Sequence, residues 1–169
     1  FSSVEMINDI YALQDEGAVS LLAEHQAFIC LMHMQGTPRT MQLAPTYHDV
    51  TQEVYDFLVQ RIQVCETAGI QRDRLILDPG FGFGKFGKNL EQNCELFKKL
   101  TTFSDIKCPL LVGVSRKTML GALIEQPVEQ RVLASAVAAL LAAQKGAKIL
   151  RVHDVMETKQ ALTLWHHLG

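Results

Sequence analysis

Five short apolar runs, each of strand length, recur along this chain with helix-like segments between them. The runs occupy residues 5–10, 27–32, 74–77, 109–114 and 148–152. Runs such as Phe28-Ile29-Cys30-Leu31 are apolar on both faces, which is typical of parallel strands buried between layers. The alternation of strand and helix therefore predicts an α/β fold with a parallel sheet.

Apolar residues at helical spacing predict three helices between or after these runs, over residues 48–67, 132–143 and 155–167. The second of them is rich in alanine, so it can approach a sheet closely. Gly69 and Gly146 stand where helix C-terminal caps are expected. Residues 35–45 contain one glycine and two prolines and predict a loop.

Composition limits the classes of function that the chain can serve. Its 169 residues fit one domain, and a net charge of −2 without a basic run argues against nucleic-acid binding. No apolar run approaches the ~20 residues of a membrane span, and no signal peptide is evident. Four scattered cysteines favour a reduced, cytoplasmic protein. The chain begins at Phe1 rather than at methionine, so we expect that upstream residues are missing.

Polar residues gather where the apolar runs end. They are Asn8-Asp9, His33, Asp78, Ser115-Arg116-Lys117 and Arg151-Val152-His153-Asp154. The carboxyl ends of parallel strands carry the ligand site both in barrels and in open α/β sheets. We therefore expect these groups to meet at one edge.

The segment from Leu75 to Lys85 is the most specific of these strand ends. Asp78 closes an apolar strand, where a charge is costly unless a partner satisfies it. The glycines that follow allow close approach of a flat or anionic ligand. Asp78 alone could equally be a helix cap or a satisfied core carboxylate, but its loop favours ligand contact.

Arg151 and His153 are two residues apart, so in a strand they share a face. They also precede a predicted helix N-terminus, whose free amides favour an anion. This pair therefore predicts a phosphate-binding pocket.

Two glycine patterns offer other interpretations. Residues 82–87 fit G-x-G-x-x-G with Asp105 about twenty residues on, but Asp105 precedes a strand instead of ending one. Residues 82–88 nearly fit a P-loop, but Asn89 replaces the required Ser or Thr. Taken singly, Asn8 could be a helix cap, Met32 a core residue and Lys117 a surface lysine.

Taken together, the motifs resemble the dihydropteroate synthase family, the folate-pathway transferases blocked by sulfonamides. The segments that carry the resemblance are Ile7-Asn8-Asp9-Ile10, Cys30 to Gly36, Leu77 to Lys85, Leu111 to Lys117 and Arg151 to Val155. They follow the family's order and approximate spacing from one end of the chain to the other. The resemblance implies a (β/α)8 TIM barrel of the pterin-binding type, of which residues 1–169 supply strands four to eight.

The chain departs from the family pattern in two ways. Nothing corresponds to the first three β/α units, which carry the asparagine loop that helps to hold magnesium and pyrophosphate and an aspartate that contacts the pterin. We therefore expect a Mg²⁺ cofactor whose protein ligand lies outside this chain. The second departure is the extra Phe86-Gly87-Lys88, which we expect to be absorbed at the surface.

The resemblance also implies a role for each site residue. The pterin would contact Asn8, Met32, Asp78, Phe83, Gly113 and Lys117, and p-aminobenzoate would contact Phe83, Lys117 and Thr118. Arg151 and His153 would hold the leaving pyrophosphate, so Lys117, Arg151 and His153 are the expected catalytic residues. Thr118 stands where the family commonly has serine.

The implied reaction condenses 6-hydroxymethyl-7,8-dihydropterin pyrophosphate with p-aminobenzoate to give 7,8-dihydropteroate and pyrophosphate. The implied partners are these small molecules and a second copy in a homodimer, with no nucleic acid or membrane. Two alternatives remain: a pterin-binding methyltransferase module, and a partial barrel that is not catalytic because its sheet edges are open.

Overall fold

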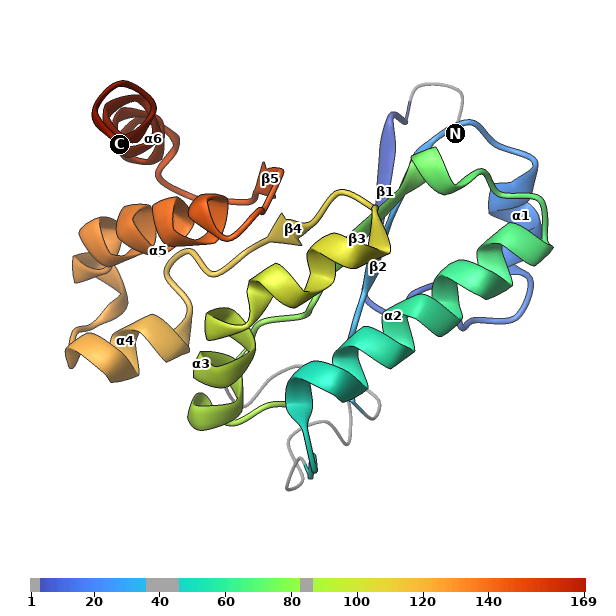
Figure 1. Ribbon diagram of the computed structural model, residues 1–169, viewed down its shortest axis with the longest axis horizontal. Coiled ribbons are helices and arrows are strands. Elements are labelled where there is room, and N and C mark those ends of the chain that lie inside the picture. The colour runs from blue at the N-terminus through green and yellow to red at the C-terminus, as the bar shows by residue number, and fades with distance from the viewer. Residues whose placement is uncertain (1–3, 36–45, 83–86) are drawn as a thin grey trace.

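The computed structural model describes residues 4–35, 46–82 and 87–169. Strands and helices alternate as the sequence predicts (Figure 1). The strands are β1 (Met6–Asp9), β2 (Phe28–Met32), β3 (Leu75–Asp78), β4 (Leu111–Val112) and β5 (Ile149–Leu150). The α-helices are α1 (Ala18–Ala23), α2 (Val50–Thr67), α3 (Leu90–Lys98), α4 (Thr118–Ile124), α5 (Val132–Gln144) and α6 (Val155–Leu168). Short 3₁₀ helices are η1 (Arg72–Arg74), η2 (Leu100–Ile106) and η3 (Val128–Gln130).

Every described strand pairing is parallel and joins neighbours in sequence order. β1, β2 and β3 form one sheet, and β4 pairs with β5. A parallel bridge between Leu77 and Leu110 connects the two groups. The carboxyl ends of all five strands therefore lie along one continuous edge, and the predicted α/β class is confirmed.

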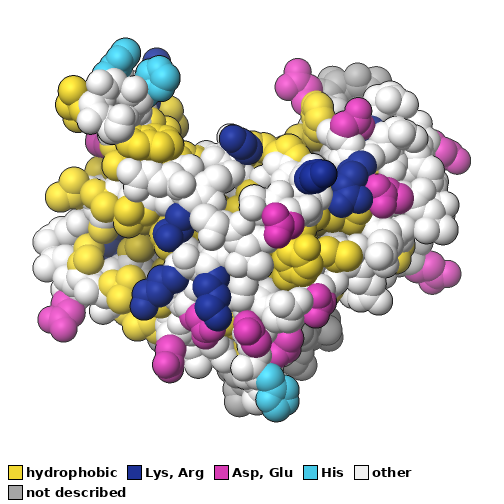
Figure 2. Space-filling model, viewed as in Figure 1, with side chains coloured by type: hydrophobic (Ala, Val, Ile, Leu, Met, Phe, Trp, Pro, Cys, Tyr) yellow, Lys and Arg dark blue, Asp and Glu magenta, His cyan; other side chains and the backbone are white. Residues whose placement is uncertain are grey.

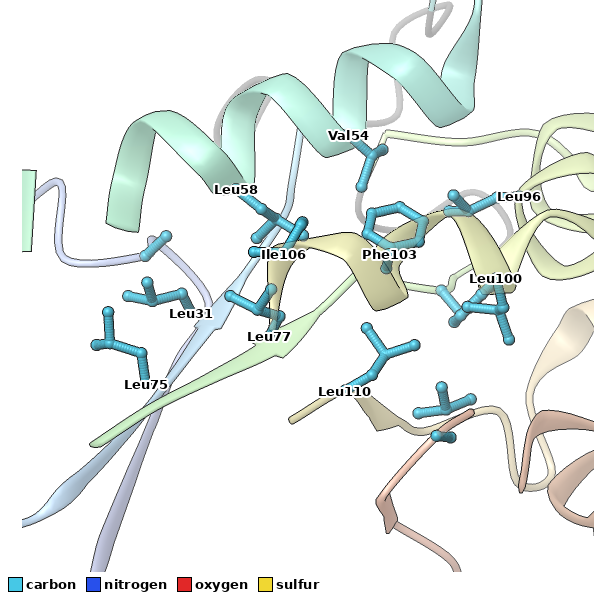
Figure 3. Close-up of a cluster of buried hydrophobic side chains, with 14 of the residues drawn as sticks. Leu31, Val54, Leu58, Leu75, Leu77, Leu96, Leu100, Phe103, Ile106 and Leu110 are labelled. Atoms are coloured by element: carbon cyan, nitrogen blue, oxygen red, sulfur yellow. The ribbon is translucent and has the colours of Figure 1, made fainter. Parts of the chain in front are cut away.

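The main core lies between the sheet and the helices that cover its outer face (Figure 3). Leu31 and Leu77 point from the strands toward Val54 and Leu58 of α2, and Phe103 of η2 closes the layer. Burying an aliphatic or aromatic side chain of this size stabilises the fold by ~1.5–3 kcal/mol. This layer fixes the strand register and hence the positions of the strand ends.

The three predicted helices are present as α2, α5 and α6, and Gly69 and Gly146 take the left-handed conformation after the first two. Helices α1, α3 and α4 were not predicted, since they are short, with six, nine and seven residues. The caps explain two of the helix starts: Asp49 accepts from Thr51 N and Gln52 N, and Asn89 forms a capping box at α3. The predicted loop at 35–45 lies, apart from Gln35, outside the described residues.

Two sequence expectations about burial are wrong. Strand β1 and the start of β2 are not buried on both faces, because the paired residues Met6 and Phe28 are 41% and 49% exposed. Lys88 does not lie at the surface, because its side chain is completely buried. Its ammonium instead lies within hydrogen-bonding distance of Gly80 O and His33 Nδ1.

The flank formed by α5 and α6 carries many apolar side chains at the surface (Figure 2). Leu133 on α5 is 76% exposed, and Leu164 and Leu168 on α6 are 61% and 81% exposed. None of the helices in the described part of the chain is long and apolar enough to traverse a lipid bilayer.

Candidate functional site

The strand register places the predicted site residues on one face of the sheet. Asn8 pairs with Cys30, Cys30 pairs with Ile76, and Met32 pairs with Asp78, so these side chains point to the same side. Cys30, Ile76 and Leu111 pack together there, away from the helices.

The last two strands continue this inner face. Leu111 pairs with Ile149, so Gly113 and Arg151, each two residues further along, lie on the same side near the carboxyl ends. The sequence thus predicts correctly that the strand ends converge.

Asp78 lies at the centre of this edge and is only 2% exposed. Its Oδ1 accepts a hydrogen bond from Gly80 N at 2.8 Å, and its Oδ2 is 3.6 Å from Arg151 Nη2. Burial raises the pKa of the Asp78 carboxyl, although the Gly80 amide and the nearby cations oppose the rise. A buried carboxylate that faces cations can accept hydrogen bonds from a polar ring edge.

Arg151 is aimed at Asp78 because Gly113 has no side chain. A Cβ at Gly113 would come within 3.0 Å of Arg151 Nε and 3.1 Å of Nη2. The arginine side chain remains 48% exposed, so its guanidinium can also meet a ligand from solvent. In this structure the room beside Gly113 holds the guanidinium, and its predicted contact with a pterin ring stays a prediction.

Lys117 comes from the turn before α4 and donates a hydrogen bond to the carbonyl of Phe81. Burial lowers the pKa of Lys117 to about 8; Asp78 opposes the shift and Arg151 adds to it. Lys117 therefore joins the end of β4 to the loop after β3. Thr118 follows as the first residue of α4 and is exposed.

A cavity of about 300 Å³ opens between the ends of β4 and β5. Its lining residues are Gly113, Ser115, Lys117, Arg151, Val152 and His153. Two cationic side chains and a histidine around one space form a setting that suits an anion. This supports the pocket that the Arg151 and His153 pattern predicts.

Ser115 is expected at the ligand edge, but the sequence predicts no role for it at the site. Its buried hydroxyl accepts from His153 N at 3.1 Å and lies 3.0 Å from His153 Nδ1. Because Nδ1 is engaged, Nε2 is the ring nitrogen left to meet a ligand. The signal was present in the sequence, since Ser115 also ends a strand, but its partner could not be identified.

A bidentate ion pair stabilises the same region. Arg116 Nε and Nη2 lie 3.0 and 2.5 Å from the two carboxylate oxygens of Asp154. The pair joins the loop after β4 to the start of α6, and it lowers the pKa of Asp154. Arg116 also takes the left-handed conformation, with φ at 56°. The strand ends that line the cavity are thus fixed relative to each other.

The remaining predicted residues are less central. Met32 shares the inner face with Asp78 and is 1% exposed, whereas Asn8 is exposed on the edge strand. Phe83 lies outside the described residues. Asp105, required for a dinucleotide site, is exposed in η2, away from any strand end.

Comparison with known proteins decides the family. The profile described as "Pterin binding enzyme" matches residues 2–153. The chain belongs to the pterin-binding enzyme family.

Within this pterin-binding family the similar curated proteins are dihydropteroate synthases. That of Haemophilus influenzae is 48% identical over 162 residues, which are 96% of this chain and 58% of the relative. That of Neisseria meningitidis serogroup B is 50% identical, over 98% of this chain and 59% of the relative. The chain thus spans somewhat more than half of the length of these relatives.

Solved structures of dihydropteroate synthases are also similar to this chain. A dihydropteroate synthase from Xanthomonas albilineans in complex with 7,8-dihydropteroate is 45% identical with a TM-score of 0.88, over 96% of this chain and 60% of that one. The Yersinia pestis enzyme with a sulfonamide drug complex is 44% identical with a TM-score of 0.92, over 98% of this chain and 59% of that one.

The described residues do not fit a magnesium ion. Within residues 4–35, 46–82 and 87–169, no group of three His, Cys, Asp or Glu side chains is placed to hold a metal. The expectation that Mg²⁺ is held by residues outside this chain stays a prediction.

Proposed function

We propose that residues 1–169 form the part of a dihydropteroate synthase that contributes strands four to eight of a (β/α)8 barrel. The consecutive parallel strands and the likeness to solved dihydropteroate synthases support this. The inner face also supports it, because a cavity of about 990 Å³ opens beside Met6 and Phe28. Phe28 is 49% exposed there, on the face that the other strands of a closed barrel would cover.

The proposed reaction joins p-aminobenzoate to 6-hydroxymethyl-7,8-dihydropterin pyrophosphate. The observation that carries it is the approach of Asp78, Lys117 and Arg151 at one edge, with His153 in the adjoining cavity. The amine nitrogen attacks the exocyclic methylene carbon, and the C–O bond breaks with its electron pair going to pyrophosphate. The new ammonium then releases a proton.

Each group at the edge has a proposed part in this step. The Asp78 carboxylate accepts from the pterin amino and ring N–H groups, with Asn8, Met32 and Gly113 beside the ring. Lys117 bonds the pterin and lies next to p-aminobenzoate, which Thr118 and Phe83 also border. Arg151 and His153 stabilise the charge that develops on the leaving pyrophosphate, which lowers the barrier because that charge is greater in the transition state.

Arg151 reaches Asp78 in this structure, so we expect pterin pyrophosphate to redirect it. The pterin edge would satisfy Asp78, and the guanidinium would turn to the diphosphate. This exchange keeps both charges paired, so the buried Asp78 carboxylate is never left without a partner.

The decisive assay follows incorporation of radiolabelled p-aminobenzoate into pteroate. It uses the complete enzyme, meaning this chain joined to the part of the relatives' length that it does not span. Formation of 7,8-dihydropteroate with release of pyrophosphate is the expected result. Pterin binding without pteroate formation would favour the methyltransferase module.

The partial barrel alone is expected to be unstable and inactive. Open strand edges and the exposed inner face leave apolar surface in water. A cooperative thermal transition together with turnover by residues 1–169 alone would contradict this.

We further propose a cytoplasmic homodimer. The exposed leucines of α5 and α6 support an interface between two copies on that flank. Four free cysteines accord with a reducing compartment. Sedimentation of the complete enzyme would establish its oligomeric state.

A further inference from the structure

Lys88 is an unusual residue because its side chain is completely buried in the described structure. Lysine is almost never fully buried unless it is paired. Its Nζ donates to the carbonyl of Gly80 at 3.0 Å and lies 3.0 Å from His33 Nδ1. Burial lowers the pKa of Lys88 to about 7, while Asp78 opposes the shift and Lys117 adds to it.

Burial of the Lys88 ammonium carries an electrostatic cost, so nearby groups must compensate for it. The charged and titratable groups that bear on it are Asp78, Lys117 and His33.

His33 acts as an acceptor for this lysine. Burial, and then Lys88, lower the pKa of His33 well below its usual value, so the ring is neutral. A neutral ring that takes a hydrogen bond at Nδ1 carries its proton at Nε2. Edge contact with Phe57, at 5.0 Å between ring centroids, holds the ring in place.

These contacts surround the turn that follows Asp78. His33 N donates to Asp78 O at 2.9 Å, and Gly80 N donates to Asp78 Oδ1 at 2.8 Å. Gly80 has a φ of 73°, and a Cβ there would lie 1.8 Å from the His33 carbonyl oxygen. The turn thus packs directly on the residue after β2, with Lys88 bonded to both.

The next residues of the loop are also held. Gly82 N donates to the buried Asn93 at 3.0 Å, and the Phe81 carbonyl accepts from Lys117. Asp78 itself faces Lys117, Arg151 and Lys88 as its charged neighbours. Of these cations, Lys88 is the one that no ligand can reach, because it has no exposed surface.

We propose that Lys88 is a positioning residue: it fixes the Pro79–Gly80 turn through Gly80 and His33 and supplies a buried positive charge that keeps the Asp78 carboxylate ionised and aimed at the pterin. The inference rests on the proposed function, since pterin is the ligand that Asp78 is expected to bind. The sequence repeats Phe-Gly-Lys at 83–85 and 86–88, and the first of these repeats lies outside the described residues.

Two substitutions in the complete enzyme separate hydrogen bonding from charge. Lys88→Met removes both, while Lys88→Gln keeps an N–H donor for Gly80 O without the charge. Lys98→Met, at an exposed site on α3, is the matched control for loss of one positive charge. The readout is calorimetric affinity for 6-hydroxymethyl-7,8-dihydropterin between pH 5 and 9, with thermal unfolding measured on each variant.

We expect Lys88→Met to weaken pterin binding about tenfold at pH 6, where a lysine with a pKa of about 7 carries its charge; a loss of this size is typical when a hydrogen bond from a charged group is removed. Lys88→Gln should recover most of that affinity. In both variants the pH below which affinity falls should rise by about one unit, because an opposite charge near a carboxylate shifts its pKa by ~1–3 units. Lys98→Met should match the wild type throughout.

If the wild type binds pterin and Lys88→Met binds it with the same affinity and the same pH dependence at acid pH, the inference is overturned. The proposed function would remain intact. Failure of the wild type to bind pterin would instead reject the proposed function, and this inference with it. If neither Lys88 variant unfolds cooperatively, Lys88 serves global folding, and the positioning role is rejected.

Discussion

Replacing Asp78 with asparagine should separate the stability of the protein from its binding of pterin. The side chain is 2% exposed, and burial raises the pKa of its carboxyl. The raised pKa means that the ionised group destabilises the folded state as the pH rises past the ordinary value of aspartate, about 4. Asp78→Asn removes this cost while keeping an oxygen for Gly80 N–H.

The expected result is therefore a protein that binds poorly but is no less stable. At pH 7 the melting temperature should rise, by ~2–4 °C for each kcal/mol that the substitution gains, and this gain should vanish below pH 4, where Asp78 is itself protonated. Asparagine offers one acceptor where the pterin edge needs two, so about 3 kcal/mol of charge-assisted bonding is lost. Pterin affinity should fall at least about a hundredfold.

The measurements are calorimetric titration with pterin and thermal unfolding of the complete enzyme at pH 4 and 7. Asp105→Asn, at an exposed position in η2, is the matched control. A lower melting temperature at pH 7 together with unchanged pterin affinity would refute the reasoning.

Three further predictions concern cations. Arg151→Ala should lower the affinity for the pyrophosphate ester by about a hundredfold, because a charge-assisted hydrogen bond is lost. The affinity for pterin alone should fall much less, and titrations with both ligands measure the difference. Lys117 has a pKa of about 8, so affinity for the pyrophosphate ester should decline as the pH rises through 8, and Lys117→Met should abolish that decline. Arg74, 9% exposed, donates to the carbonyls of Leu22 and Ala27, and Arg74→Met should lower the free energy of unfolding by about 2–3 kcal/mol in urea titrations.

Each of these predictions has its own contrary outcome. Equal losses for pterin and its ester in Arg151→Ala would place the arginine on the ring. An alkaline decline that persists in Lys117→Met would assign it to another group. Lys159→Met, at an exposed position on α6, is the control and should change the free energy of unfolding by less than about 0.5 kcal/mol. If it loses as much stability as Arg74→Met, burial of Arg74 does not explain the loss.

Much of the architecture followed from local pattern. The apolar runs and helical stripes predicted the five strands of the described residues and the helices α2, α5 and α6, because the periodicity of burial follows directly from residue order. Polar residues at the strand ends then identified the edge that carries Asp78, Lys117, Arg151 and His153. Short helices escaped prediction because a stretch of six to nine residues contains too few turns to establish a helical pattern, and its stability depends on caps and tertiary packing.

Other features were decided by contacts between residues far apart in sequence. The residues next to Lys88 do not indicate burial, because its partners are Gly80, eight residues earlier in the same loop, and His33, which follows β2. Likewise, the side chain of Arg151 fills the space beside Gly113. The exposure of β1 follows from its place at the edge of the described sheet, where it pairs with β2. Residue order by itself determined the strand–helix alternation and which polar groups reach the carboxyl edge, since both are periodic and local. Only the tertiary structure decided how those charges are paired and buried, because burial and pairing depend on distances that packing alone sets.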